Sequence, residues 1–230
     1  MGFFFCGVSA VVWLVADYTA GHPYSNELIP IWNAGVRFGI FLLTSYLLIE
    51  LKTHLMHEQT LAKSDGLTGV LNVRAFKDVS RNLLELAARY HRPAVLGYID
   101  IDDFKAVNDT SGHSEGDRVL KAVANVLTRY IRATDVVGRV GGDEFAILLP
   151  ETDYAGAQMM FGRIREGLVQ VGIDGGWLIG FSIGVAVFPG VSSTIDEALM
   201  IADRLMYRVK KDGKNNVIYE EQAGVRKDAA

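Results

Sequence analysis

Two glycines followed directly by two carboxylates, Gly141-Gly142-Asp143-Glu144, form the most chemically suggestive stretch of this sequence. Residues with strand propensity lie on both sides, so the glycines predict a two-residue hairpin turn with the acids at its tip. Glycine permits positive φ there and leaves no side chain to obstruct a phosphate, while adjacent carboxylates offer the hard oxygen ligands that Mg²⁺ prefers. The stretch therefore indicates metal-assisted nucleotide chemistry, although a solvated turn before ordinary acids would have the same sequence.

A second group of carboxylates follows an apolar run of strand length, Ala94–Ile99. Asp100 and Asp102 share one face if the strand continues through them, and they diverge if the chain turns there. Acids also commonly mark the point where an ordinary strand leaves the core. We take Asp100 as the metal ligand of this segment because a buried strand that ends in acids is a typical metal site.

Together with further motifs in the same order, these two clusters resemble the GGDEF-domain diguanylate cyclases, the enzymes that condense two GTP into cyclic di-GMP. The similarity runs from about Ser64 to Asn216. It is carried by Asp65-Gly-Leu-Thr-Gly-Val-Leu-Asn72, Asp100–Lys105, Asn108–His113 with Gly116-Asp117, the signature at Gly141, and Ala202-Asp203 through Asn215. Its departures from the usual family pattern, at Val73, Val209 and Lys214, remove no metal ligand.

The resemblance implies a set of metal ligands. Asp100, the carbonyl of Ile101 and Glu144 would hold Mg²⁺, with Mn²⁺ as an alternative ion. Asp143 is implied either as a further ligand or as the base for the ribose 3′-hydroxyl. The division of roles between Asp143 and Glu144 therefore stays open.

The resemblance also implies a guanine pocket at Asn108, His113 and Asp117, and it adds Gly141 and Gly142 of the signature to the substrate-binding residues. The chemistry fits, because a carboxylate accepts from guanine N1–H and N2–H₂ while an amide both donates and accepts. The apolar spacing predicts a helix from Glu115 onward, with Asp117 in its first turn. An acid in that position would also compensate the helix dipole, which is the structural alternative.

Three lysines, Lys105, Lys210 and Lys214, are the candidates for holding the triphosphate. Lys105 follows the acidic strand end and joins Asp143 and Glu144 in the expected catalytic group. The segment Asp102–Lys105 could also offer backbone amides to phosphate oxygens. As an alternative, Lys210 and Lys214 lie at a helix end, where lysines favour the helix dipole in any protein.

The implied reaction joins the 3′-oxygen of one GTP to the α-phosphorus of another and releases two pyrophosphates. Because each domain of this family carries one GTP, the active enzyme is expected to be a homodimer. The family's product-inhibition site is matched by Arg132 and Asp135, and an arginine–aspartate pair suits a guanine-phosphate ligand. An inactive GGDEF domain that only binds cyclic di-GMP or GTP is the alternative, and no nucleic acid polymer is expected as a partner.

Length and composition are those of one soluble domain joined to an apolar segment. The chain has 230 residues, of which 50% are hydrophobic and 22% charged, and its mean hydropathy is +0.18. Residues 1–49 carry only Asp17, Glu27 and Arg37 as charges, and later residues have ordinary globular polarity. These patterns predict a transmembrane segment at residues 1–49 and a linker helix at 50–63. They further predict a cyclase domain at 64–219 and a flexible tail at 220–230.

Two apolar stretches within residues 1–49 favour a transmembrane hairpin. Phe3–Ala16 is shorter than the roughly 20 residues that a span requires, whereas Ile31–Ile49 is about long enough. A signal peptide is the alternative for the first stretch, but that stretch lacks a basic n-region. The abrupt start of the first stretch also fits the end of a larger membrane sensor. Asp17–Pro30 holds no Lys or Arg, whereas Lys52 and Lys63 follow the second stretch. This asymmetry predicts the inner membrane, with the catalytic domain in the cytoplasm.

The remaining pattern predicts an α/β fold with a mixed sheet flanked by helices. Residues 154–171 and 195–211 read as helices, and 177–188 and 216–219 as strands. Strands that alternate with helices around one hairpin are typical of such a sheet, and the resemblance implies the palm-like form found in nucleotide cyclases. Residues 50–63 read as a continuous helix, which either orients two cyclase domains or simply connects them. The single cysteine, Cys6, excludes an intrachain disulfide.

Overall fold

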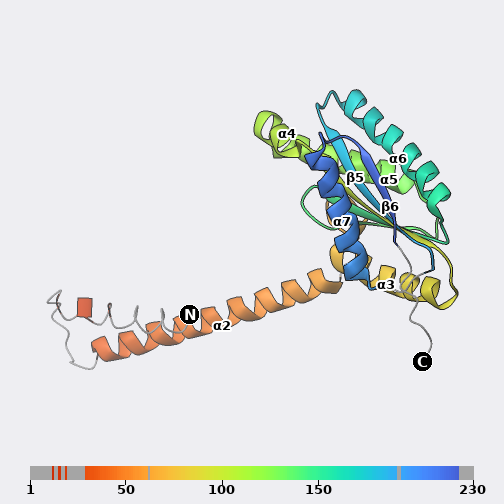
Figure 1. Ribbon diagram of the computed structural model, residues 1–230. Coiled ribbons are helices and arrows are strands. Elements are labelled where there is room, and N and C mark those ends of the chain that lie inside the picture. Colours follow the sequence, from red (N-terminus) through yellow and green to blue (C-terminus); the bar gives the residue numbers. More distant parts are fainter. Residues whose placement is uncertain are drawn as a thin grey trace. The chain divides into compact units, whose positions relative to one another are not determined.

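The computed structural model describes residues 12, 15, 16, 19, 29–61, 63–190 and 193–222, and it divides the chain into two compact units, Met1–Ala62 and Lys63–Ala230. In the first unit, helix α2 runs without a break over Ile29–Leu61 (Figure 1). The predicted linker helix is therefore a continuation of the apolar helix. The first apolar stretch and Cys6 lie outside the described residues, apart from isolated positions.

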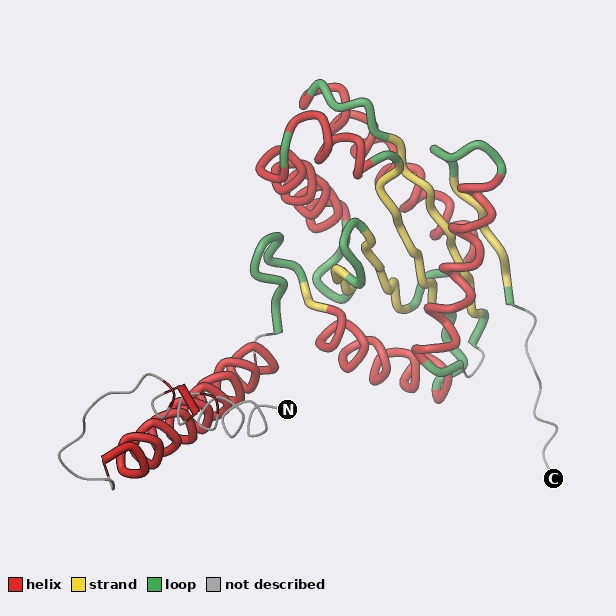
Figure 2. Tube along the Cα trace, turned by 90° about the vertical axis from the view of Figure 1, so that its left-hand side faces the viewer, coloured by secondary structure: helices red, strands yellow, loops and turns green. Residues whose placement is uncertain are grey.

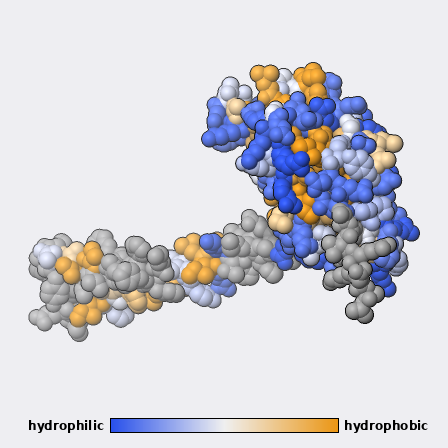
Figure 3. All heavy atoms as spheres, viewed as in Figure 1, coloured by the Kyte–Doolittle hydropathy of each residue, from blue (hydrophilic) through white to orange (hydrophobic). Residues whose placement is uncertain are grey.

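One segment of α2, Ile31–Lys52, is long and apolar enough to cross a membrane by length and composition. Its apolar side chains are widely exposed, as in Trp32 and Leu48 at 73% and 66%, and Figure 3 shows exposed hydrophobic surface on this helix. Exposed apolar surface of this extent on one helix needs a covering medium or partner. Of the expected hairpin, the described residues contain this one candidate span.

The second unit is a mixed six-stranded sheet in the order β1-β3-β4-β2-β5-β6, with helices on both faces (Figure 2). The central pairs β3–β4, β4–β2 and β2–β5 are antiparallel, and the outer pairs β1–β3 and β5–β6 are parallel. This architecture confirms the predicted fold class. The strands are β1 Leu71–Asn72, β2 Ala94–Asp102, β3 Val136–Arg139, β4 Glu144–Pro150, β5 Gly180–Phe188 and β6 Val217–Glu221; the helices are α3 Val73–Arg89, α4 Phe104–Ser111, α5 His113–Tyr130, α6 Tyr154–Gly175 and α7 Ile195–Lys211.

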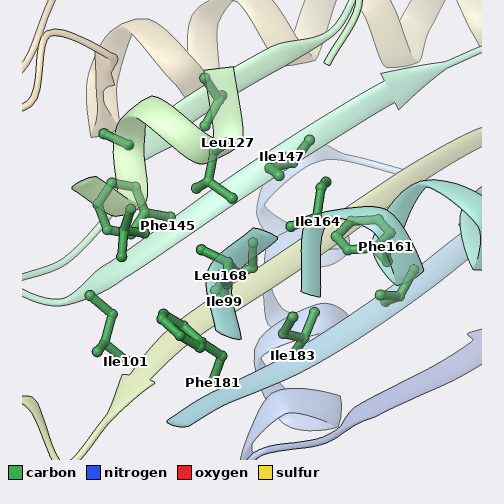
Figure 4. Close-up of a cluster of buried hydrophobic side chains, with 14 of the residues drawn as sticks. Ile99, Ile101, Leu127, Phe145, Ile147, Phe161, Ile164, Leu168, Phe181 and Ile183 are labelled. Carbon is green, nitrogen blue, oxygen red and sulfur yellow. The ribbon is translucent and has the colours of Figure 1, made fainter. Parts of the chain in front are cut away.

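Alternate residues of β2 serve two separate hydrophobic cores. Ile99 and Ile101 face α5 and α6, where they pack with Phe145, Phe161 and other buried side chains (Figure 4). Leu96 faces the opposite way, into a second core formed with α3 and α7. Because side chains alternate along a strand, Tyr98, Asp100 and Asp102 lie on the same face as Leu96. The carboxylates of β2 therefore lie on the face that α3 and α7 cover.

Several element boundaries differ from the sequence prediction. Helix α5 begins at His113, two residues before the expected start, and α6 continues to Gly175, where Gly176 ends it with a positive φ of 67°. Strand β5 begins at Gly180 rather than at residue 177. Strand β6 includes Glu220 and Glu221, which the sequence placed in the tail, because both pair with β5. The rest of the tail, from residue 223, lies outside the described residues.

Candidate active site

The two predicted carboxylate clusters lie side by side at one end of the sheet. Strand β2 continues through Asp102, so Asp100 and Asp102 share a face, and each is only 3% exposed. In the antiparallel register Asp100 is paired with Glu144, the first residue of β4. The carbonyl of Asp143 accepts a hydrogen bond from the Ile101 N–H at 3.3 Å. Residues more than 40 positions apart in sequence are thereby joined into one acidic site.

The signature turn differs from its prediction. The connection between β3 and β4 has four residues, Val140–Asp143, and neither Gly141 nor Gly142 has a positive φ. Glycine matters at Gly141 for another reason: a Cβ there would overlap the carboxylate of Glu144, so any larger residue would displace that side chain. A Cβ at Gly142 would meet nothing within 4 Å, so open space lies beside the acids. The glycines leave room for the Glu144 side chain and for a ligand.

An arginine that the sequence analysis did not single out holds the turn in place. The guanidinium of Arg139 donates to the Gly142 carbonyl from Nε at 3.1 Å and from Nη2 at 2.6 Å. Its Nη1 donates to Asp65 Oδ1 at 3.1 Å, and Thr68 donates to that same oxygen from both its N–H and its hydroxyl. Burial opposes ionisation of Asp65, but the Thr68 and Arg139 hydrogen bonds outweigh it and lower the pKa of that carboxyl. Arg139 thus connects the signature turn to the first motif of the domain.

The site concentrates negative charge in a buried place. Burial raises the pKa of Asp100, and the nearby Asp143 and Asp102 add to the rise, while Lys210 opposes it. Burial likewise raises the pKa of Glu144, with further contributions from Asp100 and Asp143. Each carboxylate therefore favours a cation beside it.

Two more side chains act on Glu144. The hydroxyl of Tyr98 forms a hydrogen bond with the Glu144 carboxylate, and the pKa of Tyr98 is raised by burial and by that carboxylate. Asp203, exposed on α7, adds to the rise in the pKa of Glu144. Tyr98 reads as an ordinary apolar strand residue in the sequence, so only its contact with Glu144 indicates a role.

The side chains here suit a hard divalent cation. The ammonium of Lys210 lies 2.7 Å from Asp100 Oδ2, so a positive charge already occupies the position next to this carboxylate. Within the described residues, no group of three or more His, Cys, Asp or Glu side chains is arranged to hold a metal ion. The available donors are carboxylate and carbonyl oxygens, which Mg²⁺ and Mn²⁺ accept. The donor chemistry therefore fits the implied ion, and Lys210 stands where a cation is needed.

The expected guanine residues gather where α4 meets α5. The two helices are separated by a single residue, Gly112, at φ 84°. Asn108 comes from α4, and its amide oxygen lies so close to Gly116 of α5 that a Cβ there would overlap it. His113 and Asp117 are both exposed on α5. Since α5 begins at His113, Asp117 lies in the second turn, and the acid of the first turn is Glu115. Compensation of the helix dipole in the first turn therefore does not explain Asp117.

The three candidate lysines have different surroundings. Lys210 is paired with Asp100, and Lys214 with Asp103 at 2.7 Å. Lys105 is exposed in the first turn of α4, and no ion pair among the described residues involves it. Asp103 and Lys214 have positive φ values of 60° and 63°, a conformation that non-glycine residues seldom adopt. Asp103 precedes α4, but its side chain makes no capping hydrogen bond. The first-turn amides of this helix therefore have no side-chain cap.

Arg132 and Asp135 lie in the turn between α5 and β3, apart from the acidic site in sequence. Arg132 is exposed, whereas Asp135 is buried and accepts a hydrogen bond from the Arg132 N–H at 2.8 Å. Both line a cavity of about 960 Å³, to which α3 contributes Val79 and Leu83. The carboxylate of Asp135 therefore shapes the turn that presents the Arg132 side chain.

Comparisons with known proteins identify relatives of the second unit. The GGDEF family model, described as "Diguanylate cyclase, GGDEF domain", matches residues 62–216. The chain is 40% identical over 159 residues to diguanylate cyclase DgcM of Escherichia coli strain K12, covering 68% of this chain and 38% of DgcM. It is 37% identical over 168 residues to the probable diguanylate cyclase DgcC of the same strain, covering 72% of this chain and 45% of DgcC.

A solved structure agrees with the fold. The GGDEF domain of DgcB from Caulobacter crescentus, in complex with c-di-GMP, superposes with a TM-score of 0.63 at 30% identity, covering 69% of this chain and 95% of that one. The chain spans less than half the length of DgcM and DgcC, at 38% and 45%. The similarity to these proteins therefore concerns their GGDEF regions.

Proposed function

The chain belongs to the GGDEF-domain family of diguanylate cyclases, and from this premise we propose that it condenses two GTP into cyclic di-GMP in a metal-dependent reaction. The observation that carries the proposal is the pairing of Asp100 with Glu144 at the sheet end, with a cation 2.7 Å from Asp100. A buried and a half-buried carboxylate whose pKa values are both raised would be costly in a domain that used them only for stability.

Asp100, Glu144 and the Ile101 carbonyl would hold Mg²⁺, or Mn²⁺ in its place. When bound, the ion would neutralise charge on the reacting phosphate and on the attacking oxygen. Asp143 would act either as a further ligand or as the base that takes the proton from the ribose 3′-hydroxyl. Lys210 is paired with Asp100 in the present conformation, and one third of the Lys210 side chain is exposed. A metal at Asp100 would free the ammonium of Lys210 to bind the phosphates. Lys105, Lys214 and the uncapped start of α4 would bind them as well.

Asn108, His113 and Asp117 would form the guanine pocket, with Asp117 accepting from the N1–H and N2–H₂ edge. A site built around those donors rejects a base that lacks them. The 3′-hydroxyl must come from a second GTP. Since the described residues would form one such pocket, two copies of the domain would have to face each other, which supports a homodimer.

The apolar segment Ile31–Lys52 supports a location at the inner membrane, with the cyclase domain in the cytoplasm where GTP is available. The absence of Lys and Arg from residues 17–30 and the lysines that follow the apolar segment favour that orientation. A helix that continues from the apolar segment to Leu61 would connect membrane and enzyme directly.

The test uses the full chain, purified in detergent, with GTP and Mg²⁺, and separates the nucleotides by chromatography. We expect cyclic di-GMP and pyrophosphate from GTP, no corresponding product from ATP, and no turnover after removal of divalent ions. A protein that binds cyclic di-GMP but forms none under these conditions would support the alternative, an inactive receptor domain.

We further propose that Arg132 and Asp135 bind the product and inhibit the enzyme. An exposed guanidinium beside an open cavity suits a guanine-phosphate ligand. Arg132→Ala should weaken binding of cyclic di-GMP by about 1.5–3 kcal/mol, as expected for loss of a hydrogen bond to a charged group. Initial rates without added product should change little. If added product inhibits the variant and the parent equally, the site lies elsewhere.

A further inference from the structure

The start of α5, which carries the proposed guanine-binding residue Asp117, has no cap of its own. Gly112 precedes the helix at φ 84° and has no side chain to accept from the free N–H groups of the first turn. The same glycine ends α4, so the two helices meet at a single flexible residue. Local sequence therefore does little to fix the direction in which the first two turns of α5 point.

A contact from a distant part of the chain supplies what the local sequence lacks. Trp177, between α6 and β5, donates its indole N–H to Glu115 Oε1 at 2.8 Å. Arg118 donates to both oxygens of the same carboxylate, at 3.0 and 2.9 Å. Its guanidinium carbon also lies 5.9 Å from the centre of the Trp177 ring. Glu115 is thus held by two donors, one of which comes from 62 positions away.

Trp177 is itself fixed by the end of α6. Its backbone N–H donates to the Gly172 carbonyl at 2.9 Å, after the left-handed residue Gly176. This is the hydrogen-bond pattern that anchors a chain to a helix end. The indole lies so close to Gly175 that a Cβ there would overlap the ring. The tryptophan also packs against the buried core shared by α5 and α6. A rigid element therefore directs its N–H at Glu115.

The residues next to Glu115 belong to the proposed pocket. Gly116 contacts the amide of Asn108, and Asp117 follows it. A change in the direction of the first two turns of α5 would move Asp117 and Asn108 relative to each other. We propose that Trp177 and Glu115 are positioning residues that set the guanine selectivity of the site by fixing the start of α5. This inference rests on the proposed function and adds residues outside the family motifs that the sequence displays.

The experiment compares four variants of the full chain in detergent with the parent: Trp177→Phe, Glu115→Ala, Glu115→Gln and Tyr130→Phe. Trp177→Phe removes the N–H and keeps an aromatic ring, whereas Glu115→Gln keeps an oxygen that can accept from the indole. Tyr130→Phe is the matched control, because it removes a polar group from an aromatic ring at the far end of the same helix. KM and kcat are measured for GTP and for ITP, which lacks the 2-amino group.

We expect Trp177→Phe and Glu115→Ala to raise the KM for GTP by roughly three- to tenfold, the effect of one lost hydrogen bond. The KM for ITP should change less, so the preference for GTP shrinks, and kcat should stay within about twofold. Glu115→Gln and Tyr130→Phe should keep the parental preference. A folded Trp177→Phe variant with the parental ratio of the two KM values would overturn the proposal.

A second measurement covers the case in which Trp177→Phe does not fold. Trp13→Phe and Trp32→Phe together leave Trp177 as the sole tryptophan, because the chain has three. Its fluorescence is followed while a GTP analogue with a methylene bridge between the α and β phosphates binds, as measured by equilibrium dialysis. Glu115→Ala in this background should shift the Trp177 emission, which reports loss of the contact, and should weaken binding of the analogue by roughly three- to tenfold. A shifted emission with parental binding of the analogue would overturn the proposal. If the parent binds no analogue at all, the proposed function itself is wrong.

Discussion

Asp100 and Asp102 lie two residues apart on the same face of β2 and are equally buried, at 3% exposure each, yet their surroundings differ. Asp102 accepts from the Ser182 hydroxyl at 2.8 Å and from the Asn215 N–H at 2.9 Å. Asp100 faces a lysine ammonium and other carboxylates, and its pKa is raised. Neutral donors in fixed positions hold Asp102. Asp100 is instead paired with Lys210, whose long flexible side chain can move away. Burial alone therefore does not distinguish the two carboxylates, and we propose that the exchangeable partner marks Asp100 as the metal ligand.

The largest expected effect separates the two residues by activity. Asp100→Asn and Glu144→Gln should each reduce cyclic di-GMP formation by at least about a thousandfold, because a lost ligand removes several kcal/mol of charge stabilisation in the transition state. Asp102→Asn keeps an acceptor for Ser182 or Asn215 and should retain most of the activity. Initial rates with GTP and Mg²⁺ measure the difference. If Asp100→Asn and Asp102→Asn lost activity equally, the distinction between the two carboxylates would fail.

The second prediction separates them by stability. Asp102→Ala leaves the buried Ser182 hydroxyl without its acceptor, at about 1–3 kcal/mol, and it also removes the acceptor of the Asn215 N–H. Urea denaturation of the metal-free protein should report this loss as a lower midpoint. The neighbouring Asp103→Ala is the control, since it breaks only an exposed ion pair with Lys214, which solvent and salt screen. Equal midpoints for the two variants would contradict a structural role for Asp102.

A smaller effect is expected at Tyr98, which holds Glu144 without being a candidate ligand. Tyr98→Phe removes the hydroxyl that bonds the Glu144 carboxylate. We expect the Mg²⁺ concentration at half-maximal rate to rise by roughly three- to tenfold, while the rate at saturating Mg²⁺ stays close to that of the parent. Titration of the initial rate with Mg²⁺ checks this. A variant with the parental Mg²⁺ requirement would show that the hydrogen bond does not position Glu144.

The smallest effect concerns pH. Folding raises the pKa of Glu144, so ionisation of this group destabilises the metal-free fold, and that loss disappears as pH falls through the raised value. Glu144→Gln should therefore melt a few degrees above the parent at about pH 7.5, and the difference should shrink towards about pH 5. Thermal unfolding in chelator at several pH values tests this. A gap that widens on acidification would mean that the pKa is lowered instead.

Local patterns predicted several of the elements, and together with the resemblance they pointed to the residues that lie at the acidic end of the sheet. Helix α7 begins and ends where the sequence predicted, because its start carries a capping box between Thr194 and Glu197 and its apolar spacing is regular. The acids of β2 and β4 were predicted as one site through the resemblance. The conformation of the glycine turn was not predicted correctly. Glycine is found both where the backbone has a positive φ and where another group approaches closely, and the sequence does not distinguish these two cases.

The contacts that hold the site could not be predicted from local sequence. Arg139 reaches Asp65 over 74 positions, and Trp177 reaches Glu115 over 62. Tyr98 has the pattern of an ordinary strand residue, and its role depends on the register that brings Glu144 beside it. Such pairs become visible only once strand order and helix packing are known. Helix α3 was also not predicted, although its apolar face fills the second core.

Binding of Mn²⁺ in the presence of the α,β-methylene GTP analogue, followed by electron paramagnetic resonance, tests the central claim most directly. The claim is that Asp100, rather than its equally buried neighbour Asp102, holds the metal. The parent and Asp102→Asn should bind Mn²⁺ alike, and Asp100→Asn should bind it at least about tenfold more weakly. Equal Mn²⁺ binding by Asp100→Asn and the parent, with both proteins folded, would contradict the account.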